Sequence, residues 1–212
     1  MSEGNDADEI GFTWVNYLLN DVLNPIAAES DAQLVAIGHS FGTRIVLGAH
    51  YVRDILLRSQ PVADTPVTLI GMQAAFPAGR FISQEGKEHQ YVRANKGDAR
   101  VIITSSDSDK ANSTICYYNF LGWDIGTGYV GGPCGLEQVK KNPELYGKSI
   151  TVLKTNKAGQ PANPPILKQV SLYNASPFVG CELEGTSSGS HSDVYDQEMG
   201  HFLGEIIRSV NE

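Results

Sequence analysis

The sequence predicts an α/β domain, in which helices cover both faces of a mostly parallel β-sheet. Residues 34–37, 67–72 and 101–104 are short, uninterrupted apolar runs, as expected for parallel strands that are buried on both faces. After Gly42 the apolar residues instead recur at spacings of three and four, the pattern of a helix that packs on a sheet. The same spacing returns in residues 199–210, so strands and helices alternate along the chain.

Length and composition fit a single domain that spans residues 1–212. Of these residues 41% are apolar and 19% are charged, which is ordinary for a globular protein. The net charge is −8 and Lys and Arg form no cluster, so we expect no nucleic-acid partner. No apolar run reaches the roughly 18 residues that a transmembrane helix needs, and the acidic start shows no signal-peptide pattern. These features predict a soluble, cytoplasmic protein.

The other elements can be placed in order along the chain. Residues 1–9 are polar and acidic and are expected to be disordered, and an apolar stripe over residues 10–26 predicts the first helix. Residues 122–165 are rich in Gly, Lys, Asn and Pro, which predicts an irregular surface insertion with one short strand at 150–153. Residues 167–173 are expected to form the last strand, near the edge of the sheet.

A Gly-x-Ser-x-Gly motif, from Gly38 to Gly42, joins the first strand to the helix that follows it. A turn this tight brings backbone segments close together, so glycine is expected at both ends of the motif. The turn would hold the hydroxyl of Ser40 clear of the sheet, where it can act as a nucleophile. The backbone N–H of Phe41, at the helix start, would then point toward an oxyanion formed on a substrate carbonyl, assisted by the helix dipole.

The serine hydroxyl needs a base to remove its proton, and His191 is the predicted base. It lies in a flexible Gly/Ser-rich loop that follows a strand, and such loops at the carboxyl ends of parallel strands build the sites of open α/β sheets. His39 lies within the motif, and its side chain should point away from the site that Ser40 faces. His50 and His89 show no feature that places them near a strand end. His201 is the weaker alternative for the base, because it shares a helical face with charged residues and is expected to be solvated.

A carboxylate must orient the base and stabilise its charged form. The loop after residues 101–104 offers two candidates, Asp107 and Asp109. One of them is expected to orient His191, and the other to cap the following segment through turn chemistry. A serine, then an aspartate, then a histidine is the chain order of an α/β-hydrolase triad.

Three segments, residues 38–42, 106–111 and 189–195, resemble the motifs of α/β-hydrolase serine esterases and lipases, uncharacterised microbial members in particular. The resemblance implies an α/β-hydrolase-like fold. It also implies a serine hydrolase that cleaves a carboxylic ester or related acyl bond of a small molecule, with no cofactor and no metal.

The resemblance also assigns roles to individual residues. In the family the acid loop often has Asp followed by a basic residue and Ala, as Asp109 has here, which favours Asp109 over Asp107. Ser40 would attack the substrate to form an acyl-enzyme, His191 would relay protons, and Asp109 would orient His191. Two other functions stay open: acyl transfer by the same residues, and a non-catalytic binding or interaction module that has lost part of its oxyanion hole.

The chain departs from the family at its start. Family members form their second oxyanion donor in a loop after an early strand, upstream of all residues present here, so Phe41 is the one donor that the sequence places. The fold is therefore expected to be N-terminally truncated. The missing strands would leave an apolar sheet edge, which an oligomer could cover.

The cysteines Cys116, Cys134 and Cys181 fit neither a zinc site nor a Cys-x-x-Cys motif. Their odd number leaves at least one thiol unpaired within the chain. Buried free thiols are the first expectation, and a disulfide between Cys116 and Cys134 is the alternative for an exported protein.

Overall fold

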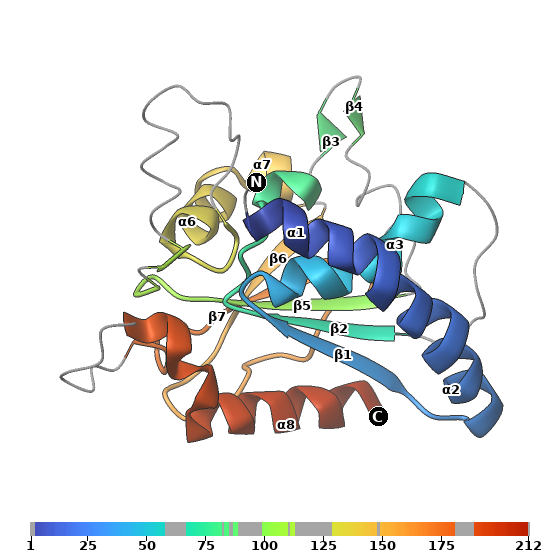
Figure 1. Ribbon diagram of the computed structural model, residues 1–212. Helices are drawn as coiled ribbons and strands as arrows, with labels where there is room; N and C mark the ends of the chain where they lie inside the picture. The colour runs from blue at the N-terminus through green and yellow to red at the C-terminus, as the bar shows by residue number, and fades with distance from the viewer. Residues whose placement is uncertain are drawn as a thin grey trace.

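The structure, a computed structural model, is organised around a parallel β-sheet (Figure 1). It describes residues 3–57, 67–81, 83–84, 87–88, 99–109, 111–112, 129–147, 149–180 and 189–211. Five of the described strands form this sheet in the order β1-β2-β5-β7-β6, and every neighbouring pair is parallel. These strands are β1 (Leu34–His39), β2 (Val67–Met72), β5 (Ala99–Ser105), β7 (Val170–Asn174) and β6 (Ile150–Lys154). The predicted α/β class is confirmed.

Helices cover both faces of the sheet (Figure 1). One face carries α3 (Gly42–Leu57), α6 (Pro133–Lys141) and α7 (Pro143–Tyr146). Packed on α3 is an N-terminal helical stretch made of α1 (Glu3–Ile10), η1 (Gly11–Val15), η2 (Leu18–Leu23) and α2 (Asn24–Ser30). The other face carries α8 (Gln197–Asn211), preceded by the 3₁₀ segment η4 (Gly189–Tyr195). The remaining short elements are η3 (Ala78–Phe81) and the antiparallel pair β3 (Ser83–Gln84) and β4 (Lys87–Glu88).

The core has two halves, one on each face of the sheet. Leu69 and Val101 belong to the half that contains residues of α3 and α6, whereas their neighbours Ile70 and Ile102 belong to the half that contains residues of α8. All four side chains are buried. Successive side chains of a strand point to opposite faces, so a sheet covered on both faces requires uninterrupted apolar runs such as those in the sequence.

The edge strands of the sheet can be compared with the positions expected from the sequence. Strand β1 is at one edge of the sheet that the described strands form, and Ile37 on this strand is 42% exposed. Leu34, Val35 and Ala36 on the same strand are partly buried against the core, so Ile37 is the exposed apolar side chain of this edge strand. Strand β7 lies next to the opposite edge strand, β6, and so is near an edge as predicted.

Helix α1 shows that the expectation of disorder in residues 1–9 is wrong for the residues from Glu3 onward. Ala7 is buried, and the carboxylate of Asp8 pairs with the guanidinium groups of Arg44 on α3 and Arg80 on η3. Burial raises the pKa of Asp8, but the hydrogen bonds and charges of the two arginines outweigh it and leave the pKa below its ordinary value. The acidic residues resemble a solvated tail in sequence because these partners lie 36 and 72 residues further along the chain.

The segment predicted as an irregular insertion, residues 122–165, contains regular elements where it is described. It contains α6, α7 and β6, of which only the strand was expected. Leu136 and Tyr146 are buried in the core half under α3, so these helices are part of the domain core. Helix α6 begins at Pro133, because proline has no N–H to satisfy in the first turn and its φ already suits a helix.

Cys134 is disulfide-bonded, so the expectation of free thiols is wrong for this residue. The other two cysteines, Cys116 and Cys181, lie outside the described residues. In the part of the chain that the structure describes, no helix has the length and apolar character needed to cross a membrane.

Candidate active site

Ser40 lies in the sharp turn between β1 and α3. Its φ is 54°, in the left-handed region that residues other than glycine rarely adopt. The turn is fixed by hydrogen bonds to the next strand and its loop: the N–H of Ser40 donates to the carbonyl of Met72 (3.0 Å), and the carbonyl of Ser40 accepts the N–H of Ala75 (3.2 Å). A serine held in this conformation at the end of a buried strand has the geometry of a nucleophile elbow.

The two glycines of the motif are not equivalent. A Cβ on Gly38 would lie 2.3 Å from the carbonyl oxygen of Gly42, so a larger residue does not fit at Gly38. A Cβ on Gly42 would meet no atom within 4 Å. The expectation that close backbone contact requires glycine at both ends is confirmed at Gly38 and wrong at Gly42, where the first residue of α3 faces open space.

Phe41 links the elbow to the first turn of α3. Its carbonyl accepts the N–H groups of Arg44 (3.0 Å) and Ile45 (3.3 Å), so the helical hydrogen bonds begin here. No acceptor among the described residues is hydrogen-bonded to the N–H of Phe41 itself. An N–H in this position, at a helix start and directly after Ser40, is suited to bind an oxyanion, which is the role predicted for Phe41.

Asp109 and His191 form a hydrogen-bonded pair. Nδ1 of His191 lies 2.9 Å from Oδ2 and 3.1 Å from Oδ1 of Asp109, whose side chain is 0% exposed. Because a carboxylate can only accept, Nδ1 of His191 carries the proton and Nε2 is left as the basic nitrogen of the neutral ring. Asp107 is exposed, and its N–H donates to the hydroxyl of Ser176. The structure thus brings Asp109, and not Asp107, to the predicted base.

Asn112 holds the carboxylate of Asp109 from the other side. Its backbone N–H donates to Oδ1 (3.1 Å), and its side-chain Nδ2 donates to Oδ2 (2.8 Å) and to the carbonyl of Gln73 (2.8 Å). The buried carboxylate is therefore fixed by three donor groups, including the ring of His191. The sequence analysis missed Asn112, although an asparagine three residues after an aspartate was available as a signal of local side-chain hydrogen bonding.

His191 is part of η4 and not of a flexible loop, which corrects the prediction for this segment. The carboxylate of Asp193 accepts the N–H of Gly180 at 2.7 Å, and Val194 packs against the core half under α8. Helix α8 follows almost directly. The Gly/Ser content of the segment alone suggested mobility. The sequence does not reveal these contacts, because their partners lie outside the segment.

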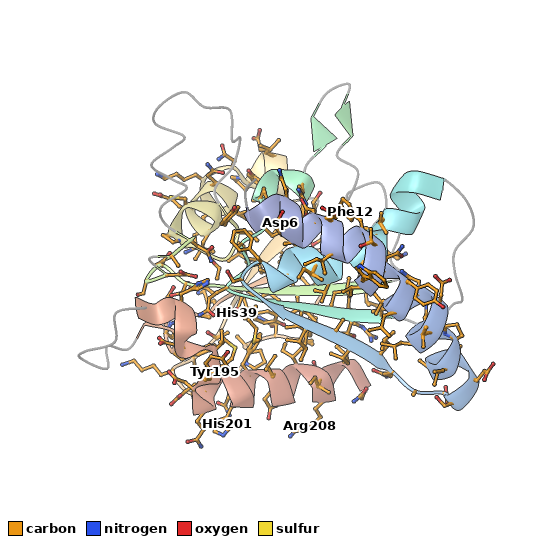
Figure 2. All side chains as sticks on the ribbon, in the orientation of Figure 1. Asp6, Phe12, His39, Tyr195, His201 and Arg208 are labelled. Carbon is orange, nitrogen blue, oxygen red and sulfur yellow. The ribbon has the colours of Figure 1, made fainter. Side chains whose placement is uncertain are left out.

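His39 does not point away from the predicted site, in contrast to the expectation from the sequence. Its ring lies against the ring of His191, with centroids 4.6 Å apart and planes at 42°. Its Nε2 lies 2.9 Å from the carbonyl oxygen of His191, and since that oxygen only accepts, Nε2 of His39 is the donor. Figure 2 shows His39 at the end of β1 near η4. Burial lowers the pKa of His39, and the charge of His191 lowers it further.

Ser40 is connected to the Asp109–His191 pair through the end of β1. It directly follows His39, whose side chain contacts His191. Between these described residues no hydrogen bond joins the hydroxyl of Ser40 to the ring of His191. Bonds between nucleophile and base are often long until substrate binds. Because β1, β5 and β7 are parallel, their carboxyl ends lie at the same end of the sheet. The segments with Ser40, Asp109 and His191 follow these strands in the chain.

The other histidines lie elsewhere. His201 is exposed on α8 (Figure 2), and His50 on α3 places its ring against that of Tyr51, with centroids 4.8 Å apart. His89 is outside the described residues. Over the described ranges, no group of three or more His, Cys, Asp or Glu side chains is arranged to hold a metal ion.

Comparisons of the chain with protein-family models, with curated proteins and with solved structures give no match, so its function is inferred from the geometry of the site.

Proposed function

We propose that this chain is a serine hydrolase of the α/β-hydrolase type, which cleaves a carboxylic ester or a related acyl bond of a small molecule. The observation that carries the proposal is the pairing of His191 with the buried carboxylate of Asp109, at 2.9 Å, beside the elbow that holds Ser40. A buried carboxylate on Nδ1 fixes the tautomer of an imidazole that acts as a general base. The chain order of these residues, Ser, Asp, His, supports the same proposal.

In the first half of the reaction, Nε2 of His191 takes the proton from the hydroxyl of Ser40 as Oγ attacks the substrate carbonyl carbon. The negative charge that develops on the carbonyl oxygen is stabilised by the N–H of Phe41 and the dipole of α3. Asp109 stabilises the imidazolium that forms at His191. When the carbon–oxygen bond to the leaving group breaks, His191 returns its proton to the departing alkoxide, and the acyl group stays on Ser40.

In the second half, His191 takes a proton from a water molecule as the water oxygen attacks the acyl carbon. The bond to Oγ of Ser40 then breaks, His191 gives the proton back to Ser40, and a carboxylic acid leaves. Displacement by another nucleophile in place of water would give acyl transfer on the same residues.

The proposal is tested by turnover of 4-nitrophenyl acetate and butyrate. Ser40→Ala should lower kcat by at least about 10³-fold, because residual rates then come from binding and the oxyanion donor alone. The matched control is Ser30→Ala, which removes an exposed serine hydroxyl on α2 that donates only to its own helix and should leave kcat unchanged. Background turnover by a folded wild-type protein would refute the proposal and favour the non-catalytic binding module.

We also propose that a second copy of the chain covers the edge of β1. This strand carries an exposed Ile37 and lies at one edge of the sheet that the described strands form, and such edges pair readily with other strands. Sedimentation should show a dimer that Ile37→Lys dissociates, and a monomeric wild-type protein would rule the dimer out.

A further inference from the structure

We propose that His39 is a positioning residue, which fixes the position of His191 relative to Ser40. It does so by donating a hydrogen bond to the backbone carbonyl of His191 and by packing on its ring. This inference rests on the proposed hydrolase function and adds a residue to that site. The triad motif itself assigns no task to the residue before the serine. Here its geometry assigns one.

The first observation is that His191 is held at two separate points. Asp109 bonds the ring at Nδ1 (2.9 Å), which fixes how the imidazole is rotated. His39 bonds the carbonyl oxygen (2.9 Å), which fixes the backbone from which the ring extends. The carboxylate of Asp193 also holds η4, but two residues further along the chain, through the N–H of Gly180. Without the bond from His39, rotation about the Asp109 contact would still allow the backbone at residue 191 to shift, and Nε2 would move with it.

The second observation is the place of His39 in the chain. It is the last residue of β1 and is bonded directly to Ser40, so a single peptide unit separates the nucleophile from the side chain that holds the base. His39 would therefore resist a shift of η4 relative to the sheet directly beside Ser40, where such a shift would change the distance between nucleophile and base. Reactions between two positioned groups lose about 10²-fold in rate for a misplacement of about 1 Å.

The third observation is that the ring of His39 is suited to be neutral in this position. Burial lowers the pKa of His39 most strongly, and the charge of His191 lowers it further. The hydrogen bond to the carbonyl of His191 and the charge of Asp109 raise the pKa but are weaker, so it stays below its ordinary value. A neutral ring with the proton on Nε2 donates to the carbonyl of His191 and places no second positive charge beside the imidazolium formed during the reaction. It can therefore pack on His191 at a centroid distance of 4.6 Å without opposing catalysis.

The test compares His39→Gln, which keeps a donor, with His39→Leu, which removes it. The Nε2 of Gln is separated from Cα by the same number of bonds as the Nε2 of His, so it can reach the carbonyl of His191. We expect His39→Leu to lower kcat by about 10- to 100-fold with KM changed less than about threefold, and His39→Gln to restore kcat to within about threefold of wild type. His201→Gln, an exposed histidine of α8, is the matched control and should behave as wild type.

A second readout does not depend on activity. Amide hydrogen exchange over residues 189–195 should be faster in His39→Leu than in wild type and should return toward wild type in His39→Gln, while exchange in β2 and β5 is unchanged in both. Equal loss of kcat in the two variants, or wild-type kcat and exchange in His39→Leu, would overturn the proposal. If the wild type shows no ester turnover but exchange in the two variants changes as expected, the hydrolase function is refuted while the positioning of η4 by His39 is supported.

Discussion

Replacing Asn112 by Ala tests how the site keeps its carboxylate in place. The substitution removes Nδ2, which donates to Oδ2 of Asp109 and to the carbonyl of Gln73, both at 2.8 Å. It leaves the backbone N–H of residue 112, which donates to Oδ1 of Asp109 (3.1 Å). The carboxylate of Asp109 therefore loses one of its donors and keeps its pairing with His191.

The size of the effect follows from the burial of these groups. A hydrogen bond to a charged group contributes about 1.5–3 kcal/mol, and a second donor is withdrawn from the carbonyl of Gln73. Asn112 is 2% exposed, so water does not readily replace the lost donor. We expect Asn112→Ala to lower the free energy of unfolding by about 2–4 kcal/mol, a large part of the roughly 5–15 kcal/mol typical of a domain. Because Asp109 is then less well fixed, kcat should fall about 10-fold or more.

Urea unfolding followed by circular dichroism measures the free energy, and ester turnover measures kcat. The matched control is Asn142→Ala, since Asn142 donates through Nδ2 to the carbonyl of Gln138 at 3.0 Å on an exposed helix end. This control should cost no more than about 1 kcal/mol and leave kcat unchanged. Equal losses of stability for the two variants, with full turnover in Asn112→Ala, would show that Asn112 does not hold the carboxylate.

Three further predictions concern the rest of the domain. Gly38→Ala should prevent folding or strongly destabilise the elbow, because its Cβ would lie 2.3 Å from a carbonyl oxygen; a soluble variant with an unchanged thermal midpoint would contradict the observed packing. Asp8→Asn should lose the stability that the ion pairs with two arginines contribute. The pKa of Asp8 in the folded protein lies below the unfolded value near 3.8. The difference in unfolding free energy between wild type and variant should therefore be full at neutral pH and vanish as pH falls through the folded pKa. Urea melts from pH 7 to pH 2 measure this, and a difference independent of pH would argue against it. Native protein denatured without reductant should show one reactive thiol and three after reduction, because Cys134 is disulfide-bonded and the chain has three cysteines; three thiols before reduction would refute the disulfide.

Much of the fold can be predicted from the sequence because its strands are buried on both faces. That burial demands the uninterrupted apolar runs of residues 67–72 and 101–104, which are strands β2 and β5. The elbow is predictable for a similar reason, since a strand, a tight turn and a helix each leave a local pattern around Ser40. The acid and base segments were each predicted to follow a strand, which places the candidate site at the carboxyl ends of the strands.

The parts that could not be predicted depend on contacts between distant residues. Helix α1 is held by pairs from Asp8 to arginines far along the chain, and its acidic composition alone resembles a disordered tail. The contact of His39 with His191 joins residues 152 positions apart. The place of His39 within the motif suggested the wrong direction for its side chain, because η4 approaches the end of β1 and brings His191 against it. A sequence pattern carries no signal for such an approach.

The most direct test of the proposed hydrolase function is to locate the adduct that a fluorophosphonate probe forms with the native protein, by mass spectrometry of its peptides. We predict one adduct, on Ser40, that forms at least about 10³-fold more slowly when His191 is replaced by Ala. An adduct on a different residue, or labelling of Ser40 at an unchanged rate without His191, would contradict the proposed triad.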